Sequence, residues 1–193
     1  FVGGRTSPVT IGDFTFELGP TFVMLPQAFE DVFSKVGRKI SDYLEMKQLD
    51  TLYRLKFGDG RNFTVSYNKE IMKREIARLF PGDEKGYDLY LKKQKRKFEL
   101  MYPCLKVPYI HWFHYLRPKL LRALPYMQNF TSVYDVMAKY FKHDDMRISM
   151  TFQAKYLGMS PWHCPGTFSI LSYIEHAFGI YHPIGGVHRS EEH

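Results

Sequence analysis

The stretch that decides the fold covers residues 156–186 and reads YLGMSPWHCPGTFSILSYIEHAFGIYHPIGG. A helix ends at Leu157-Gly158, and the chain then passes into a proline-containing loop. The apolar segment that follows predicts a helix over residues 167–178 and a short strand over residues 179–182. This late strand requires a partner, so we expect a small sheet built from strands that lie far apart in the chain.

The segments before this stretch predict a few strands and a long helical insertion. Alternating residues predict a strand over residues 10–17, and a Gly-containing loop between residues 53–57 and 62–67 predicts a β-hairpin. Beyond Asn68 the apolar period is helical. Helices are expected from Pro26 to a C-cap at Gly37, from Asn68 to Phe80, from an Asp83 cap to Met101, from a Ser132-x-x-Asp135 capping box to Phe141, and from an Asp144 cap to Leu157. The expected fold class is α+β, with a small, mainly antiparallel sheet.

Composition narrows the class of partner. The 193 residues carry a net charge of +7, and 17% are aromatic, with nine Met. The positive charge fits a nucleic acid, an anionic membrane surface or no specific partner. Abundant aromatic and Met side chains favour an apolar ligand or a bilayer, so we expect no nucleic acid.

The expected localisation of the protein follows from its apolar runs, its N-terminal residues and its two cysteines. No run approaches the ~18 consecutive apolar residues of a spanning helix, and no secretory signal is visible. We therefore expect a cytoplasmic, peripherally membrane-associated protein. Cys104 and Cys164 lie in unrelated contexts and predict neither a disulfide framework nor a zinc site. The abrupt start at Phe1 suggests a section of a longer protein.

The densest basic run is Lys92-Lys93-Gln94-Lys95-Arg96-Lys97. It fits a solvated helix face or a contact with anionic lipid headgroups. The apolar stretch that follows is rich in Trp and Tyr and carries Lys119 and Arg122, which is typical of an interfacial helix; a buried helix explains its aromatic residues as well, but its cations less well.

Self-contained catalytic motifs are missing from the sequence. It has no GxGxxG, P-loop, nucleophile elbow or Ser-His-Asp signature. His111 and His114 could share a helix face, but further ligands are lacking nearby and we expect no metal site. The Gly3-Gly4-Arg5 tripeptide fits either an exposed turn or a close approach to a pyrophosphate.

The motifs at both ends of the chain resemble the phytoene and dehydrosqualene desaturases, which are FAD-dependent flavoproteins of the amine-oxidase-like superfamily. The family pattern G-[IV]-[WY]-x-P-x-G-G is matched by residues 179–186, GIYHPIGG. Gly3-Gly4-Arg5 and residues 14–21, FTFELGPT, agree in order and spacing. Glu17 stands where the family usually has Asp.

This resemblance implies a section of an FAD-dependent carotenoid desaturase, an oxidoreductase of carotenoid biosynthesis. Residues 1–25 would edge the FAD-binding domain, 26–178 would form the substrate-binding domain with a helical membrane-facing lid, and 179–193 would return toward the FAD-binding domain. The implied cofactor-binding residues are Gly3, Gly4, Arg5, Gly185 and Gly186, and the implied substrate residues are Thr21, Phe22, Tyr156 and Trp162.

The implied chemistry removes two hydrogens from adjacent saturated carbons of a long isoprenoid chain, with hydride passing to the flavin. Arg122 is the candidate catalytic residue. Lys119 stands where some members have been proposed to carry an acid, so no protein acid is assigned. The alternatives are another polyene-acting flavin oxidoreductase or isomerase and a non-catalytic membrane-surface module. The section alone is expected to be inactive and to bind FAD weakly or not at all.

Overall fold

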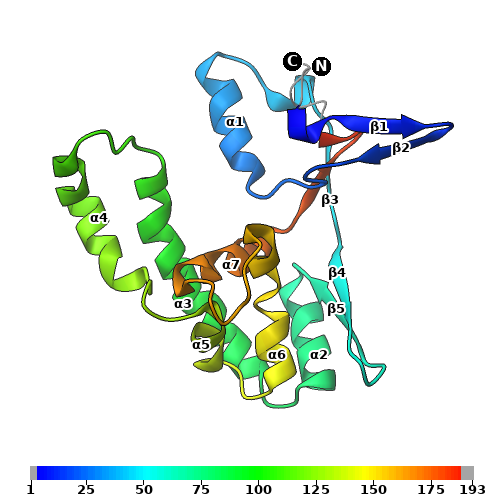
Figure 1. Ribbon diagram of the computed structural model, residues 1–193, viewed down its shortest axis with the longest axis vertical. Coiled ribbons are helices and arrows are strands. Elements are labelled where there is room, and N and C mark those ends of the chain that lie inside the picture. Colours follow the sequence, from blue (N-terminus) through cyan, green and yellow to red (C-terminus); the bar gives the residue numbers. More distant parts are fainter. Residues whose placement is uncertain (1–3, 188–193) are drawn as a thin grey trace. The chain divides into compact units, whose positions relative to one another are not determined.

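Both ends of the chain contribute strands to the same small sheet in the computed structural model, which describes residues 4–187. Strand β3 (Met46–Gln48) pairs antiparallel with β6 (Tyr181–Pro183). Val23 extends this pairing, because its N–H donates to the Tyr181 carbonyl at 2.7 Å and its carbonyl accepts from the Tyr181 N–H at 2.9 Å. The expected pairing of distant strands is confirmed (Figure 1).

The chain divides into two compact units. The terminal unit comprises Phe1–Leu52 and Phe178–His193, and the helical unit comprises Tyr53–Ala177. The domain boundaries expected at 25/26 and 178/179 concern a longer protein and stay a prediction. The α+β class is confirmed, with the strands arranged in three two-stranded antiparallel sheets within the described residues.

The terminal unit begins with a 3-10 turn, η1 (Gly4–Thr6), and a hairpin of β1 (Pro8–Ile11) and β2 (Phe14–Glu17). The single strand expected over residues 10–17 is therefore wrong. The chain reverses at Gly12-Asp13, so that Ile11 pairs with Phe14. The alternation of apolar and polar residues continues on both sides of this short turn. The sequence pattern alone therefore does not reveal the turn.

Helix α1 (Pro26–Lys35) confirms the expected helix, with Pro26 at its first position. A 3-10 turn, η2 (Ile40–Asp42), follows it. The apolar stripe of α1 is largely uncovered: Val32 is 61% exposed and Val36 is 71% exposed. The amphipathic pattern predicts the helix correctly, but the described residues do not bury its apolar face.

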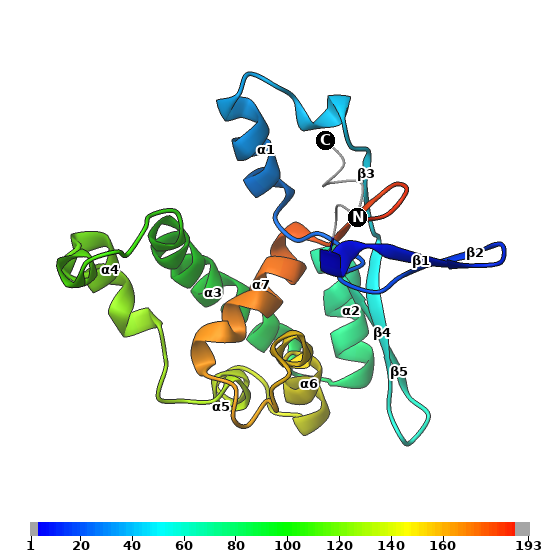
Figure 2. The ribbon, with the colours of Figure 1, turned by 45° about the horizontal axis from the view of Figure 1, so that its top comes forward.

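The helical unit contains one hairpin and six helices, linked by 3-10 turns, except that the first two residues of β4 and the last residue of α7 belong to the terminal unit. Figure 2 shows α3 and α4 side by side, as does Figure 1. The elements are β4 (Thr51–Lys56), β5 (Asn62–Ser66), α2 (Lys69–Leu79), α3 (Glu84–Leu105), η3 (Trp112–Leu116), α4 (Pro118–Ala123), η4 (Leu124–Tyr126), α5 (Val133–Ala138), α6 (Asp144–Ser149), η5 (Phe152–Leu157), η6 (Gly166–Phe168) and α7 (Ser169–Phe178).

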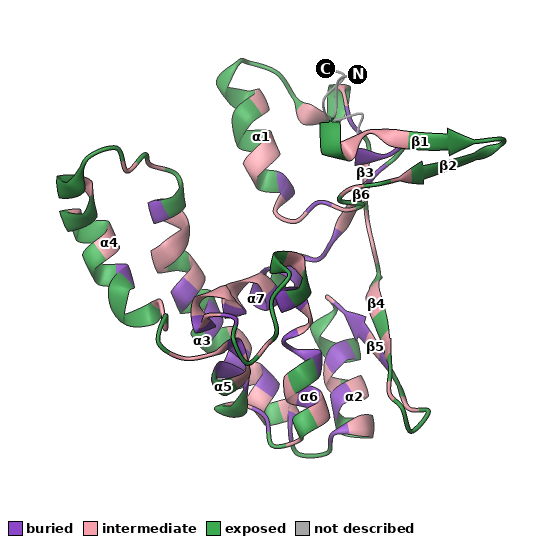
Figure 3. Ribbon diagram, viewed as in Figure 1, coloured by how far each residue is buried: buried purple, intermediate pink, exposed green. Residues whose placement is uncertain are grey.

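The core of this unit is aromatic and Met-rich. Its buried residues, purple in Figure 3, gather on α2, α3, α5, α6 and α7. Phe63 of β5 meets Phe80 edge-on at 5.3 Å between ring centroids, an arrangement that the ring quadrupoles favour. The largest fully buried apolar side chains are Tyr87, Tyr90, Phe63, Phe80, Phe141, Met72, Ile76, Met137, Met146 and Met150.

Local caps account for two helix starts and fail for two others. The Asn68 side chain accepts the N–H groups of Glu70 and Ile71, and the Ser132 capping box forms as expected. Asp83 was expected to cap α3 but makes no such bond. Its carboxylate instead accepts the N–H groups of Lys142 at 2.7 Å and His143 at 3.0 Å.

The cap of α6 also differs from the expectation, because its N-cap residue is His143 and Asp144 is already helical. The Asp83 carboxylate takes the N–H of this cap residue from a distant part of the chain. A residue from a distant part of the chain therefore fixes the backbone at the start of α6, and no side chain caps the helix.

Other expected helix boundaries are also wrong. The helix expected to reach Leu157 ends at Ser149 and is followed by η5. Helix α3 continues through Pro103 to Leu105, beyond its expected end at Met101. The aromatic stretch over residues 109–124 is broken into η3 and α4. Arg117 takes an extended conformation (φ −57°, ψ 134°), as residues before a proline do, and Pro118 then starts α4.

No helix among residues 4–187 is long and apolar enough to cross a membrane. Cys104 and Cys164 are both buried, and neither forms a disulfide.

Replacing Gly86 by Ala should destabilise the helical unit. An added Cβ would lie 2.0 Å from the Tyr140 carbonyl oxygen, so α3 would have to move away from that backbone. We expect the free energy of unfolding to fall by about 1–3 kcal/mol, measured by urea denaturation with far-UV circular dichroism. Gly58→Ala is the control, because nothing lies within 4 Å of its added Cβ. Equal stability of the two variants would contradict the close approach.

Candidate functional site

A hollow of about 510 Å³ in the terminal unit brings together residues from both ends of the chain. Residues near the β2 end form one side, and residues from β6 and the turn after it form the other. Its lining residues are Thr15, Phe16, Glu17, Thr21, His182, Gly185 and Gly186. Three predicted site residues, Thr21, Gly185 and Gly186, therefore meet at one place.

Two hydrogen bonds fix the two sides of this terminal hollow to each other. The His182 ring nitrogen Nδ1 lies 2.8 Å from the Thr21 carbonyl oxygen, which makes it the protonated nitrogen that donates. The Val187 N–H donates to Glu17 Oε1 at 2.8 Å. The loop that carries Gly185 and Gly186 is thus held on both sides.

The backbone of the Gly3-Gly4-Arg5 motif packs closely against the motif of residues 14–21 at Arg5. A Cβ added to Gly19 would lie 2.0 Å from the Arg5 carbonyl oxygen, so only glycine fits there. The Arg5 side chain is exposed. Gly4 lies beside it in η1, and Gly3 lies outside the described residues. The segment expected to contact a flavin nucleotide therefore packs directly against the FELGPT motif.

Gly185 and Gly186 form a wall of the terminal hollow that has no side chains. Both residues have positive φ angles, 91° and 101°, which side chains rarely adopt. This wall carries no Cβ, so a ligand can approach the backbone itself. With the Phe16 ring, the Thr21 hydroxyl and the His182 ring around it, the hollow suits a flat group that has both polar and apolar edges.

The remaining predicted site residues lie elsewhere. Phe22 is half-buried beside the Val23 bridge. Trp162 is 54% exposed and packs on the Tyr134 ring at 5.5 Å between centroids. Lys119 and Arg122 are exposed on α4. Within the helical unit, neither of these two cations lines the cavities described below.

Tyr156 belongs to a buried network that the sequence analysis missed. Its hydroxyl donates to Glu175 Oε1 at 2.8 Å, and Gln153 Nε2 donates to Glu175 Oε2 and, at 3.0 Å, to the Tyr53 hydroxyl. Glu175 is fully buried. Burial raises the pKa of its carboxyl, and the hydrogen bonds from Gln153 and Tyr156 offset part of that rise. The sequence held one signal for this network, because Glu175 is an acid within the largely apolar segment SYIEHAF.

His176 is buried next to Glu175 on α7. Its Nδ1 lies 3.2 Å from the Tyr87 hydroxyl. Burial lowers the pKa of the imidazole to about 4, so the ring is neutral at physiological pH.

The HWFH pair has a local structural role. His114 Nδ1 accepts the N–H groups of Ile110 at 3.0 Å and His111 at 3.3 Å, which closes the turn before η3. Among residues 4–187, no group of three or more His, Cys, Asp or Glu side chains is placed to hold a metal ion.

An apolar hollow of about 370 Å³ lies between α3 and α4. It is lined by Met101, Cys104, Leu105, Tyr109, Tyr115, Leu120, Ala123, Leu124, Met127 and Asn129. Nearby large apolar side chains are strongly exposed, with Ile110 at 74% and Trp112 at 76%. The aromatic stretch is therefore neither a continuous helix nor a buried core element, and it presents an apolar surface.

Comparison with known proteins gives one consistent result, although no family model matches the chain. It is 38% identical over 188 residues to a 4,4'-diapophytoene desaturase (4,4'-diapolycopene-forming) of Methylomonas sp., which covers 97% of this chain and 37% of the relative. It is 34% identical over 185 residues to a neurosporene-forming phytoene desaturase of Cereibacter sphaeroides, covering 96% and 36%. A zeta-carotene-forming phytoene desaturase of Myxococcus xanthus is 33% identical over 187 residues, covering 96% and 36%.

Identity at this level over nearly the whole chain makes these proteins its homologues. The chain spans little more than a third of their length. It belongs to the phytoene and diapophytoene desaturases, the carotenoid desaturase family.

Replacing Glu175 by Gln should change how stability depends on pH. The folded state holds the Glu175 proton more tightly than the unfolded chain does, because burial raises its pKa above the ordinary 4.5. The contribution of this group is therefore complete below pH 4.5 and declines as pH rises through the higher folded pKa. As pH rises from 4.5 through the folded pKa, the unfolding free energy of the wild type should fall relative to that of Glu175→Gln.

Urea denaturation of both proteins at a series of pH values measures this difference, and the contribution of His176 cancels because both proteins retain it. Glu70→Gln, at an exposed position of α2, is the control and should track the wild type. A difference between wild type and Glu175→Gln that stays constant with pH would rule the account out.

Proposed function

We propose that the complete protein containing this chain is an FAD-dependent desaturase that introduces double bonds into a long isoprenoid chain. The observation that carries the proposal is the matching of nearly the whole chain to proteins named phytoene and diapophytoene desaturases. The terminal hollow supports it, because motifs from both ends of the chain converge there.

The residues around the terminal hollow fit one edge of a flavin nucleotide. Gly4 and Arg5 would hold the nucleotide part, and Gly185 and Gly186 would lie against the flavin. The Cβ-free wall is the structural reason, since it lets a flat ring approach the backbone. When bound, the flavin would accept hydride from the substrate.

The task of the chain's own residues is mainly positioning. The bonds from His182 to Thr21 and from Val187 to Glu17 would keep the glycine turn in place while a substrate lies beside it. Thr21 and Phe22 would contact the substrate beside the terminal hollow. Tyr156 and Trp162, which belong to the helical unit, stay predicted substrate residues. Arg122 and Lys119 are exposed on α4, so we assign neither a proton-transfer role.

The helical unit would receive the substrate from a membrane surface. Its apolar hollow between α3 and α4 adjoins exposed Ile110 and Trp112, a combination that fits an apolar chain leaving a bilayer. The substrate class is a long isoprenoid, shared by the desaturases that match the chain, and the attachment to the membrane is peripheral.

The proposal is tested by incubating the complete protein with FAD and either phytoene or 4,4'-diapophytoene in liposomes. We expect longer conjugated polyenes with new absorption bands in the visible range. If the protein binds FAD but neither substrate gives new bands, a different polyene-acting flavoenzyme would be favoured. Absence of FAD binding would favour a non-catalytic membrane module.

Filling the terminal hollow should weaken FAD binding. Thr21 is exposed and lines the hollow, so Thr21→Phe places a ring inside it while leaving the backbone carbonyl that His182 contacts. We expect FAD affinity to fall by about tenfold, or ~1.4 kcal/mol, measured by fluorescence titration.

Thr51→Phe is the matched control, because Thr51 is an exposed residue of the same unit and does not line the hollow. It should bind FAD like the wild type. If Thr21→Phe also bound FAD with wild-type affinity, the assignment of this hollow to the flavin would be wrong.

A further inference from the structure

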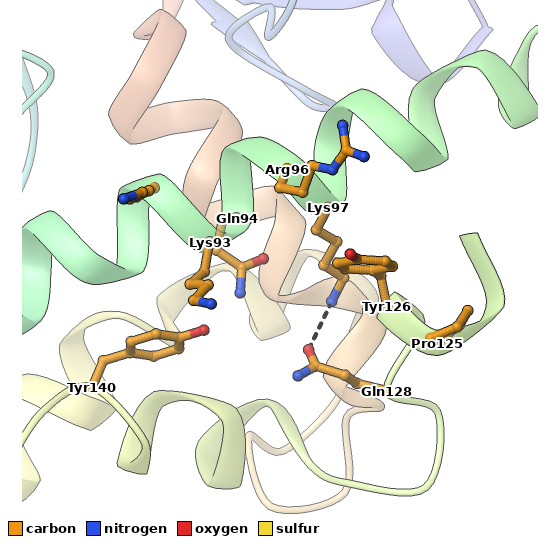
Figure 4. A pocket seen from close by; sticks show the side chains of 9 residues that line it. Lys93, Gln94, Arg96, Lys97, Pro125, Tyr126, Gln128 and Tyr140 are labelled. Atoms are coloured by element: carbon orange, nitrogen blue, oxygen red, sulfur yellow. Dashed lines mark hydrogen bonds between the residues drawn. The ribbon is translucent and has the colours of Figure 1, made fainter. Parts of the chain in front are cut away.

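A second hollow in the helical unit, of about 430 Å³, has a strongly basic lining. It lies between α3 and the segment around η4, with Tyr140 on its far side (Figure 4). The lining residues are Lys92, Lys93, Gln94, Arg96, Lys97, Pro125, Tyr126, Gln128 and Tyr140. Four of these nine residues are cations, and none is an acid.

The cations of this basic hollow are poorly compensated. Lys92 and Arg96, like Lys93 and Lys97, are like charges four residues apart on a helix, an arrangement that destabilises an isolated helix. Within residues 4–187, no carboxylate forms an ion pair with Lys92 or Lys93. Arg96 meets Glu99 only at 3.9 Å, and both side chains are largely exposed.

Lys97 forms the floor of the hollow and is 2% exposed. Its Nζ donates to the Gly166 carbonyl at 2.8 Å, to Ser169 Oγ at 3.0 Å and to Gln128 Oε1 at 3.2 Å. These partners are all neutral. Burial lowers the pKa of the ammonium to about 7, because its neutral partners compensate only part of the lost hydration.

The same contacts orient donors toward the hollow. Because Gln128 Oε1 accepts from Lys97, the amide NH₂ of Gln128 remains available as a donor. Lys93 projects from α3 toward the side where Tyr140 and Gln128 lie (Figure 4). Burial raises the pKa of the Tyr140 phenol, so its hydroxyl stays protonated. The hollow therefore offers cationic and neutral donors without a competing carboxylate.

Residues 124–128 contribute to the lining of both hollows. Tyr126 and Gln128 face the basic hollow, while Leu124 and Met127 face the apolar hollow between α3 and α4. A basic hollow and an apolar hollow thus share one segment of chain, which is the arrangement that an amphiphile with an anionic head would match.

We propose that the basic hollow binds a phosphate group, as a phosphomonoester or phosphodiester, through Lys92, Lys93 and Gln128. Tetrahedral phosphate oxygens accept several donors at once, and a hollow of this size admits such a group. The group can belong to a lipid headgroup or to a free phosphate compound. The site does not depend on the proposed desaturation reaction, because none of its lining residues is assigned to FAD or to the isoprenoid substrate.

The test compares two double variants of the complete protein that have the same net charge. Lys92→Gln/Lys93→Gln removes two lining cations. Lys85→Gln/Lys95→Gln removes two exposed cations of the same helix that do not line the hollow. Far-UV circular dichroism and the thermal midpoint verify that both variants fold like the wild type.

Binding is measured at 0.15 M salt in two arms. The soluble arm titrates inorganic phosphate and glycerol 3-phosphate by calorimetry, and the vesicle arm co-sediments the protein with phosphatidylcholine vesicles with or without phosphatidic acid. We expect Lys92→Gln/Lys93→Gln to weaken binding by about tenfold or more, and the control by about twofold or less.

The arms distinguish the source of the phosphate. Loss in the soluble arm identifies a free phosphate compound, and loss confined to phosphatidic acid vesicles identifies a lipid headgroup. Equal loss in the two double variants would mean that only net charge matters and would overturn the proposal. Wild-type protein that binds neither ligand would overturn it as well. Neither readout involves FAD or a polyene, so failure here is separate from failure of the desaturase proposal.

Discussion

The backbone pairing of β6 with β3 and with Val23 is the constraint on which the terminal unit depends. It returns the end of the chain to its beginning, so that His182 meets Thr21 across a separation of 161 residues. The entropic cost of closing so long a loop rises only slowly with its length, and a few backbone bonds with their packing can offset it. Together with the His182–Thr21 and Val187–Glu17 hydrogen bonds, this pairing holds Gly185 and Gly186 beside Thr21.

The helical unit is organised around buried polar groups as well as an apolar core. Lys97, Glu175 and His176 are all nearly or fully buried, and each has a hydrogen-bond partner. Burying such groups costs free energy unless their partners are well placed. These contacts fix α3 against the segments around Gly166 and Ser169, and they give the basic hollow a rigid floor.

Elements with local signals could be predicted, and those that depend on distant partners could not. Pro26 marked the start of α1, and Asn68 marked that of α2. Asp83 misled because its partners lie 59 and 60 residues away. In the terminal site, the family motifs pointed to Gly185, Gly186 and Thr21, but spacing alone could not place them together. Glu175 was missed because an acid within an apolar helix carries no motif.

The central claim is that both ends of this chain form one wall of a flavin site. Hydrogen–deuterium exchange of the complete protein, with and without FAD, tests it most directly. The account predicts slower amide exchange on FAD binding in residues 15–21 and in residues 182–187 together, with the β4–β5 hairpin unchanged. FAD binding that leaves both segments unprotected would contradict the account.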